Sequence, residues 1–233
     1  MKLQVDHKMK TLDVMVIAIL IIINGCSNES NELDQNIDTD PEPIITFEKD
    51  VNNVKSAVRQ TKDGGYVVAG GLGGQAWLLK LDKYGEEEWQ NTYTLGDFGY
   101  TRSVVQTMDG GYLYAGAEGI LKADSNGNEM WKNISRTKGA YPFYEDAIEH
   151  SSGDIYAVGG PGGGQAQFVK FNANGSVLAR RWYGSKCEDD IFRSIIESND
   201  GKLVVVGEKS HGNQSYDCAF NFMYYKDFWI LKL

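Results

Sequence analysis

The sequence predicts an all-β domain over residues 44–233, a small β-propeller of four four-stranded repeats. Three observations lead there. One phrase recurs four times at nearly equal intervals, two kinds of glycine turn divide each copy, and the composition combines 27 Gly and 12% aromatic residues with only 4 Pro. Four short strands in each unit of about 40 to 50 residues are the pattern of a propeller blade.

The recurring phrase is most complete in residues 60–70 and 106–116, which share Gln-Thr-x-Asp-Gly-Gly-Tyr-x-x-Ala-Gly. Weaker copies occupy residues 150–159 and 198–207. Their closing glycines are 46, 43 and 48 residues apart: Gly70, Gly116, Gly159 and Gly207. Such spacing predicts one supersecondary unit in each copy.

Turn phrases divide the repeats into strands. Asp-Gly-Gly at residues 63–65 and 109–111 predicts hairpin turns, since Gly adopts positive φ without steric cost. Asx-x-x-Gly forms a second turn at residues 82–85, 124–127 and 172–175. We expect the recurring aromatic residues to pack between blades: Trp89, Trp131, Tyr66 and Tyr112.

The fourth repeat stops after its third strand, at Leu233, whereas residues 44–50 stand before the first repeat. These residues occupy the position that fourth strands occupy elsewhere in the chain. We expect them to complete the last blade and close the propeller, which would remove open sheet edges. The alternative is that the chain is a fragment of a longer propeller.

Residues 1–25 have the pattern of a secretory signal. Three lysines precede an apolar run at residues 14–23, which is shorter than the 20 or so residues that span a bilayer. The run leads into Ile23-Asn24-Gly25-Cys26, which resembles the bacterial lipobox. That resemblance implies cleavage before Cys26 and its modification with acyl chains such as palmitate. An ordinary signal peptide, or an uncleaved anchor with an incidental cysteine, is the alternative.

Residues 26–43 are expected to be the lipidated cysteine and a flexible tether. The segment after Cys26 is polar and acidic, and it holds too few large apolar side chains to fold. Several acyl chains attach a protein durably to a membrane. Ser27 stands where Asp is the usual inner-membrane retention signal in enterobacteria, which favours the outer membrane. Glu29, Glu32 and Asp34 are compatible with display at the cell surface, as any solvated linker would be.

The repeats resemble those of exported bacterial and archaeal propellers similar to the delta-60 and quinoprotein-like repeats. The shared motif is Thr-x-Asp-Gly-Gly-Tyr-x-x-Ala-Gly followed by Leu-x-Lys-x-Asp-x-x-Gly-x-x-x-Trp, and it covers residues 44–233. The resemblance implies a scaffold for binding or surface assembly. No quinone-binding set is present, so we expect no cofactor.

Two features point to one face of the fourth repeat. Cys187 and Cys218 are expected to form a disulfide in an oxidising compartment, worth about 3 to 4 kcal/mol, with two unpaired thiols as the alternative. The insertion at residues 208–227 is rich in aromatic side chains: Tyr216, Phe220, Phe222, Tyr224 and Tyr225. These rings contact a glycan or a surface protein, or they cap the domain.

The remaining motifs do not predict a phosphate, metal or nucleic-acid site. The glycine-rich segments 70–74 and 159–164 lack a P-loop ending and predict tight turns. His150 and His211 have no neighbours at metal-ligand spacing, and residues 188–190 read as a solvated acidic turn rather than a cation site. A net charge of −9 argues against nucleic acid.

With no catalytic or metal-binding constellation, the sequence favours a lipid-anchored, non-enzymatic binding or assembly module at the outer membrane or cell surface. The alternative is a carbohydrate-active enzyme, which would require two facing carboxyl groups from separate blades.

Overall fold

The computed structural model describes residues 57–96, 100–117, 119–134, 143–160, 164–185, 189–211 and 225–233. All of these residues belong to one compact unit, Ile45–Leu233. Their regular elements are β-strands alone. In this described part of the chain, no helix has the length and apolar character needed to cross a membrane.

The first two repeats each form a four-stranded antiparallel sheet in chain order. The strands of sheet 1 are β1 (Ala57–Gln60), β2 (Tyr66–Leu72), β3 (Gln75–Leu81) and β4 (Glu87–Tyr93). Those of sheet 2 are β5 (Thr101–Gln106), β6 (Tyr112–Gly116), β7 (Gly119–Ala123) and β8 (Glu129–Ile134). The predicted glycine turns lie between consecutive strands of these sheets.

The third repeat is again four-stranded, while the described part of the fourth has three strands. Sheet 3 comprises β9 (Phe143–Glu149), β10 (Ile155–Gly160), β11 (Ala166–Phe171) and β12 (Val177–Tyr183). Sheet 4 comprises β13 (Ile191–Glu197), β14 (Leu203–His211) and β15 (Tyr225–Lys232). The predicted all-β propeller of four repeats is thereby confirmed. The closing strand expected at residues 44–50 lies outside the described residues.

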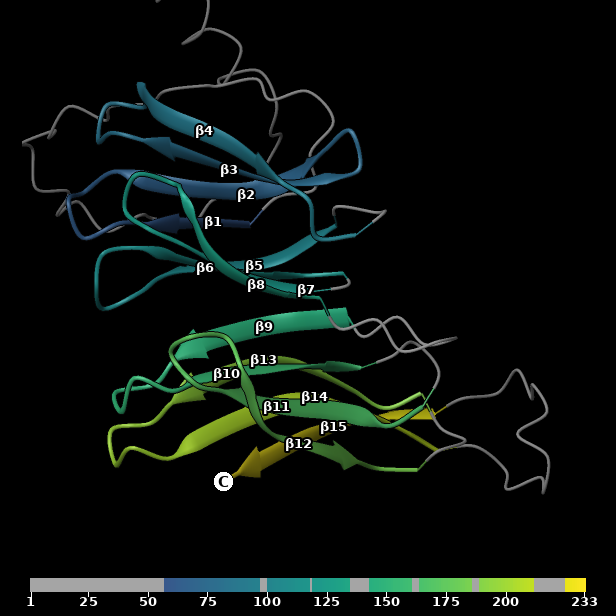
Figure 1. Ribbon diagram of the computed structural model, residues 1–233. Helices are drawn as coiled ribbons and strands as arrows, with labels where there is room; N and C mark the ends of the chain where they lie inside the picture. The colour runs from purple at the N-terminus through teal and green to yellow at the C-terminus, as the bar shows by residue number, and fades with distance from the viewer. Residues whose placement is uncertain are drawn as a thin grey trace, which may run out of the picture. The chain divides into compact units, whose positions relative to one another are not determined.

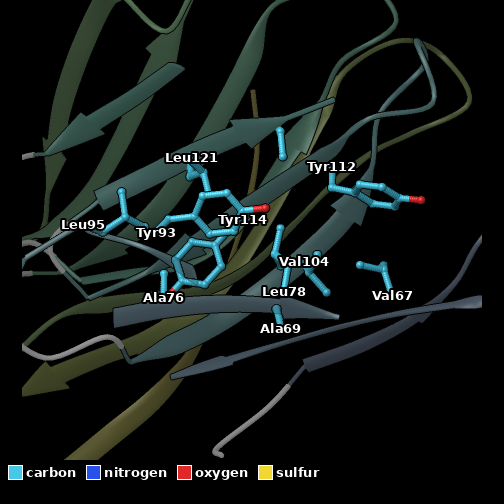
Figure 2. Packing of buried hydrophobic residues seen from close by; sticks show 11 residues of the cluster. Val67, Ala69, Ala76, Leu78, Tyr93, Leu95, Val104, Tyr112, Tyr114 and Leu121 are labelled. Atoms are coloured by element: carbon cyan, nitrogen blue, oxygen red, sulfur yellow. The ribbon is translucent and has the colours of Figure 1, made fainter. Parts of the chain in front are cut away.

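Consecutive sheets lie side by side, with the first strand of each sheet contacting that of the next (Figure 1). Alternate side chains of each sheet meet those of its neighbour in a separate buried core. The core between sheets 1 and 2 includes Val67, Leu78, Val104 and Tyr114, which Figure 2 shows packed together. Similar clusters lie between sheets 2 and 3 and between sheets 3 and 4.

The last sheet presents an apolar face to solvent. Trp229 and Leu231 of β15 pack towards sheet 3. The side chains that alternate with them remain exposed, since Phe228 and Ile230 are 77% and 60% accessible. The fourth repeat therefore has one packed face and one open face among the described residues.

Candidate functional site

Many charged residues that recur in the repeats are paired within their own sheet. In each repeat a lysine of the third strand contacts the aspartate of the turn after the first strand. The four N–O distances lie between 2.7 and 3.0 Å: Lys80–Asp63, Lys122–Asp109, Lys170–Asp154 and Lys232–Asp200. The side chains of Lys80 and Lys122 are 2% and 5% exposed. A buried ammonium group is costly without its carboxylate, so these pairs belong to the scaffold.

The same pairs keep the turn carboxylates ionised. Burial works to raise the pKa of Asp109, but hydrogen bonds from Lys122 and Thr107 outweigh it and lower that pKa to about 2. A hydrogen bond from Lys232 is the main reason why the pKa of Asp200 falls to about 2. At neutral pH these groups accept hydrogen bonds and have no proton to donate.

Each pair of consecutive sheets is joined by a hydrogen bond that we call the turn latch. A backbone N–H in the first turn of one sheet donates to the Gln or Glu that ends the first strand of the next. The three latches are Lys62 to Gln106 at 2.8 Å, Met108 to Glu149, and Ser151 to Glu197 at 2.8 Å. At the two ends of the series, the Gln60 side-chain oxygen and the Asn199 amide have no latch partner among the described residues.

The predicted role of the recurring tryptophans between blades is confirmed. Trp89 Nε1 donates to the Ser125 carbonyl at 3.2 Å, and Asn91 Nδ2 donates to the Gly127 carbonyl at 3.0 Å. The same bonds join sheet 2 to sheet 3: Trp131 to Ala173 at 2.8 Å and Asn133 to Gly175 at 3.1 Å. An ideal Cβ on Gly127 would lie 2.6 Å from the Trp89 ring. The Asx-x-x-Gly turn therefore needs glycine for contact between sheets as well as for its backbone.

At the other end of the first strands, sheets 2, 3 and 4 each contain a β-bulge. One residue of β5, β9 and β13 has no partner in the ladder with the second strand: Arg102, Glu145 and Arg193. A bulge redirects its side chain away from the regular alternation. All three redirected side chains are charged.

The closing glycine of each of these repeats lies opposite the bulge. Gly159 pairs with Tyr144, and an ideal Cβ on it would lie 1.8 Å from the carbonyl oxygen of Phe143. The corresponding distances are 2.2 Å from Gly116 to Tyr100 and 2.1 Å from Gly207 to Ile191. No side chain fits at these separations. The recurring glycine is thus explained by the bulge that it admits.

The bulged side chains converge. Glu145 Oε1 lies 3.6 Å from Nε of Arg102 and 3.5 Å from Nη1 of Arg193. Arg193 Nε donates to Glu208 Oε1 at 2.8 Å, and Lys226 Nζ donates to Glu208 Oε2 at 2.8 Å. We call these five residues the bulge cluster.

The bulge cluster exposes its cations more than its central carboxylate. The side chains of Arg102 and Arg193 are 44% and 43% exposed, whereas that of Glu145 is 10% exposed. Hydrogen bonds from Arg193 and then from Lys226 lower the pKa of Glu208 to about 2, and the bond to Glu208 raises the pKa of Arg193. Three cations against two carboxylates give this cluster a positive balance in a chain of net charge −9.

Asp146 fixes the three bulges relative to one another. Its Oδ1 accepts a hydrogen bond from Ser103 Oγ at 2.7 Å, and its Oδ2 accepts one from Ser194 Oγ at 2.8 Å. Each of these three residues directly follows a bulged residue. One carboxylate therefore ties the first strands of sheets 2, 3 and 4 together immediately beside the bulge cluster.

The predicted aromatic loop is attached to this cluster at one end. Tyr225 begins β15, where its backbone pairs with His211, and the next residue is Lys226 of the bulge cluster. The other four aromatic residues lie outside the described residues: Tyr216, Phe220, Phe222 and Tyr224. Cys26, Cys187 and Cys218 also lie outside them, so the acylation and the disulfide stay predictions.

The expectation of a solvated acidic turn at residues 188–190 is wrong for Asp190. Its side chain is buried and accepts hydrogen bonds from the amides of Ser185 at 2.9 Å and Ser210 at 2.8 Å. The carboxylate therefore joins the connection after β12 to strand β14. The glycine turn after β2 is confirmed, since Gly73 and Gly74 have φ of 58° and 81°.

His150 contacts turn residues of its own sheet and of the next. Its ring nitrogens lie 2.8 Å from Ser152 Oγ and 3.0 Å from the Gly201 carbonyl oxygen of sheet 4. Within the described ranges, no group of three His, Cys, Asp or Glu side chains is arranged to hold a metal ion.

Sequence reasoning did not single out the bulged residues. A signal was present, because Arg102, Glu145 and Arg193 each stand four residues before the Gln or Glu that ends the first strand. That fixed phase marks equivalent positions in three repeats. The convergence of the three side chains is visible only in the structure.

No family model and no curated protein matches the sequence. Among solved structures, a protein of unknown function from Bacteroides caccae is similar at 18% identity and a TM-score of 0.45, over 62% of this chain and 53% of its own. The WD40 domain of Pan2 from Neurospora crassa is similar at 10% identity and a TM-score of 0.48, over 77% of this chain and 63% of its own. The chain spans less than two thirds of either solved chain.

Proposed function

We propose that this chain is a lipid-anchored, non-enzymatic binding or assembly module at the outer membrane or cell surface, with the bulge cluster at the centre of its binding surface. The observation that carries the proposal is how the repeats use their charges. The Lys–Asp pairs hold the turns of all four sheets together. Arg102 and Arg193, in contrast, remain about half exposed on strands fixed by bulges and by Asp146. Rigid presentation of exposed charge suits binding.

The membrane anchor in this proposal rests on the sequence before the propeller. The apolar run at residues 14–23 leads into the lipobox-like Ile23-Asn24-Gly25-Cys26, and a polar tether follows. An acylated Cys26 would hold the propeller at a membrane, leaving the tether to separate it from the lipid surface.

An enzymatic function is not favoured by the described carboxyl groups. A glycosidase usually needs one carboxylic acid with a raised pKa beside an ionised carboxylate. Every described carboxyl group whose pKa departs from its ordinary value departs downwards, and Glu208 of the bulge cluster has a pKa of about 2. Reproducible turnover of a glycan or peptide by the purified chain would overturn the proposal.

The anchor is tested by expressing the full chain in a Gram-negative bacterium with radiolabelled palmitate. Wild type should incorporate the label and fractionate with membranes, whereas Cys26→Ala should do neither. Equal labelling of the two proteins would refute lipidation at Cys26.

The binding surface is tested by probing arrays of glycans and surface proteins with the full chain. We expect the double variant Arg102→Gln/Arg193→Gln to lose the signals that wild type gives, and the exposed-arginine control Arg59→Gln to keep them. Signals retained by the double variant would place the binding surface elsewhere.

A further inference from the structure

We infer that the bulge cluster is a carboxylate-binding site, at which a ligand carboxylate takes hydrogen bonds from Arg102 and Arg193. The inference rests on the proposed function, since it names the ligand chemistry of the same surface. Its starting point is the contact that the two arginines already make. Both approach one oxygen of Glu145, so the spacing of the two guanidinium groups fits a carboxylate between them.

Glu145 leaves much of this donor capacity unused. Charge-assisted N–H···O bonds are usually about 2.7 to 2.9 Å long, whereas the contacts to Glu145 are 3.5 and 3.6 Å. Arg102 has no other acceptor among the described residues, and its guanidinium group carries five N–H donors. A ligand carboxylate can form the shorter, bidentate bond for which guanidinium is shaped.

The charge balance favours an anion at this position. Glu208 is shared by Arg193 and Lys226, and Glu145 is shared by Arg102 and Arg193. Two carboxylates therefore face three cations within the cluster. The neighbouring Asp146 adds a third carboxylate, but its oxygens accept hydrogen bonds from Ser103 Oγ, Ser194 Oγ and the Ile195 amide. The third-strand lysine of each repeat has its own aspartate, so the bulge cluster differs from these pairs in this respect.

The site is held ready for a ligand. The three bulges are fixed by glycines whose partners leave no room for a side chain, and Asp146 joins the residues that follow them. Arginine side chains based on such strands lose less freedom on binding than side chains on a free loop.

The experiment is calorimetric titration of the full chain in detergent with sodium glucuronate, with its neutral methyl ester as the matched probe. We expect glucuronate to bind and the ester to bind about tenfold more weakly or worse. Arg102→Gln should weaken glucuronate binding by a similar factor. Glu145→Gln should strengthen it, because this substitution removes the competing carboxylate. Arg59→Gln, which removes an exposed charge from β1, should leave it unchanged.

Thermal melts of the variants separate binding from folding. Glucuronate binding that is insensitive to Arg102→Gln in a folded protein would overturn the inference, and so would weaker binding in Glu145→Gln or equal binding of inorganic sulfate. If the chain binds a neutral glycan or a protein and Arg102→Gln retains that binding, the carboxylate inference fails while the proposed binding function stands. Turnover without stable binding would instead defeat the proposed function itself.

Discussion

The two ends of the first strands make different use of the same repeat. At the latch end, a backbone amide meets a Gln or Glu side chain at each of the three junctions between consecutive sheets. At the bulge end, equivalent positions hold Arg102, Glu145 and Arg193, which differ in charge and contact one another. A bond that is repeated at every junction between sheets serves the scaffold. Variation in charge at one equivalent position of the repeats is typical of a binding site.

The comparison shows how a repeat can gain a site without losing its packing. The bulge adds one residue to the first strand, and glycine opposite accepts the distortion. The cores between sheets are formed by other positions of the same strands. Side chains at the bulge are therefore free to differ between repeats. Four substitutions, in order of decreasing effect on stability, test this separation.

Gly159→Ala should be the most destabilising. Its Cβ would meet the Phe143 carbonyl oxygen at 1.8 Å, so the bulge has to move, at about 3 kcal/mol or more of unfolding free energy. Urea unfolding measures the loss. The control Gly73→Ala meets open space and carries only the penalty of its φ of +58°, about 1 to 2 kcal/mol. Equal losses would show that close approach to the bulge is unimportant.

Asp109→Ala should be less severe, lowering the free energy of unfolding by about 1 to 3 kcal/mol because buried Lys122 loses its carboxylate. The matched variant Asp200→Ala leaves Lys232, whose side chain is 51% exposed, to be solvated by water. We expect less than about 1 kcal/mol there. A larger loss in Asp200→Ala than in Asp109→Ala would contradict the scaffold role of the buried pairs.

Glu149→Ala removes one turn latch and leaves the Met108 amide without its acceptor. We expect a loss of about 1 kcal/mol in urea unfolding. Glu149→Gln should restore most of it, because Gln106 already accepts the same bond at the junction before. Failure of this rescue would mean that the charge of Glu149, and not the latch, is what matters.

Arg102→Gln should have the smallest effect, within about 0.5 kcal/mol in the same assay, since its ion pair with Glu145 is long and Arg102 is half exposed. Loss of more than about 1 kcal/mol would assign Arg102 to the scaffold. It would contradict the view that the latch end of the first strands stabilises the fold and the bulge end binds a ligand.

The repeats were predictable because their determinants are local. Asp-Gly-Gly and Asx-x-x-Gly specify turns by backbone chemistry, and the equal spacing of the closing glycines marks the units. The tryptophans could also be assigned to contacts between sheets. Within the described ranges the last sheet has three strands, in agreement with a fourth repeat that ends on its third strand.

The candidate site could not be predicted in the same way. A bulge shifts the alternation of a strand by one residue. The fixed spacing of Arg102 and Glu145 from the end of the first strand marks equivalent positions, but it does not indicate that shift. Closing glycines such as Gly116 indicated a repeat, but not that a neighbouring carbonyl group occupies the space of a side chain. The burial of Asp190 could not be predicted because it depends on the amide of Ser185, in the same connection, and on that of Ser210, in strand β14.

The turn latch also makes the two ends of the series of sheets different from each other. Every latch has an amide half and a side-chain acceptor half, and among the described residues the unused halves differ: Asn199 offers the amide in sheet 4, and Gln60 offers the acceptor in sheet 1. Two copies of one half cannot bond to each other. In any contact between chains that uses this bond, the Asn199 end of one chain therefore meets the Gln60 end of another, and a twofold-symmetric dimer can use it only by forming both such junctions at once, as a ring closed from head to tail.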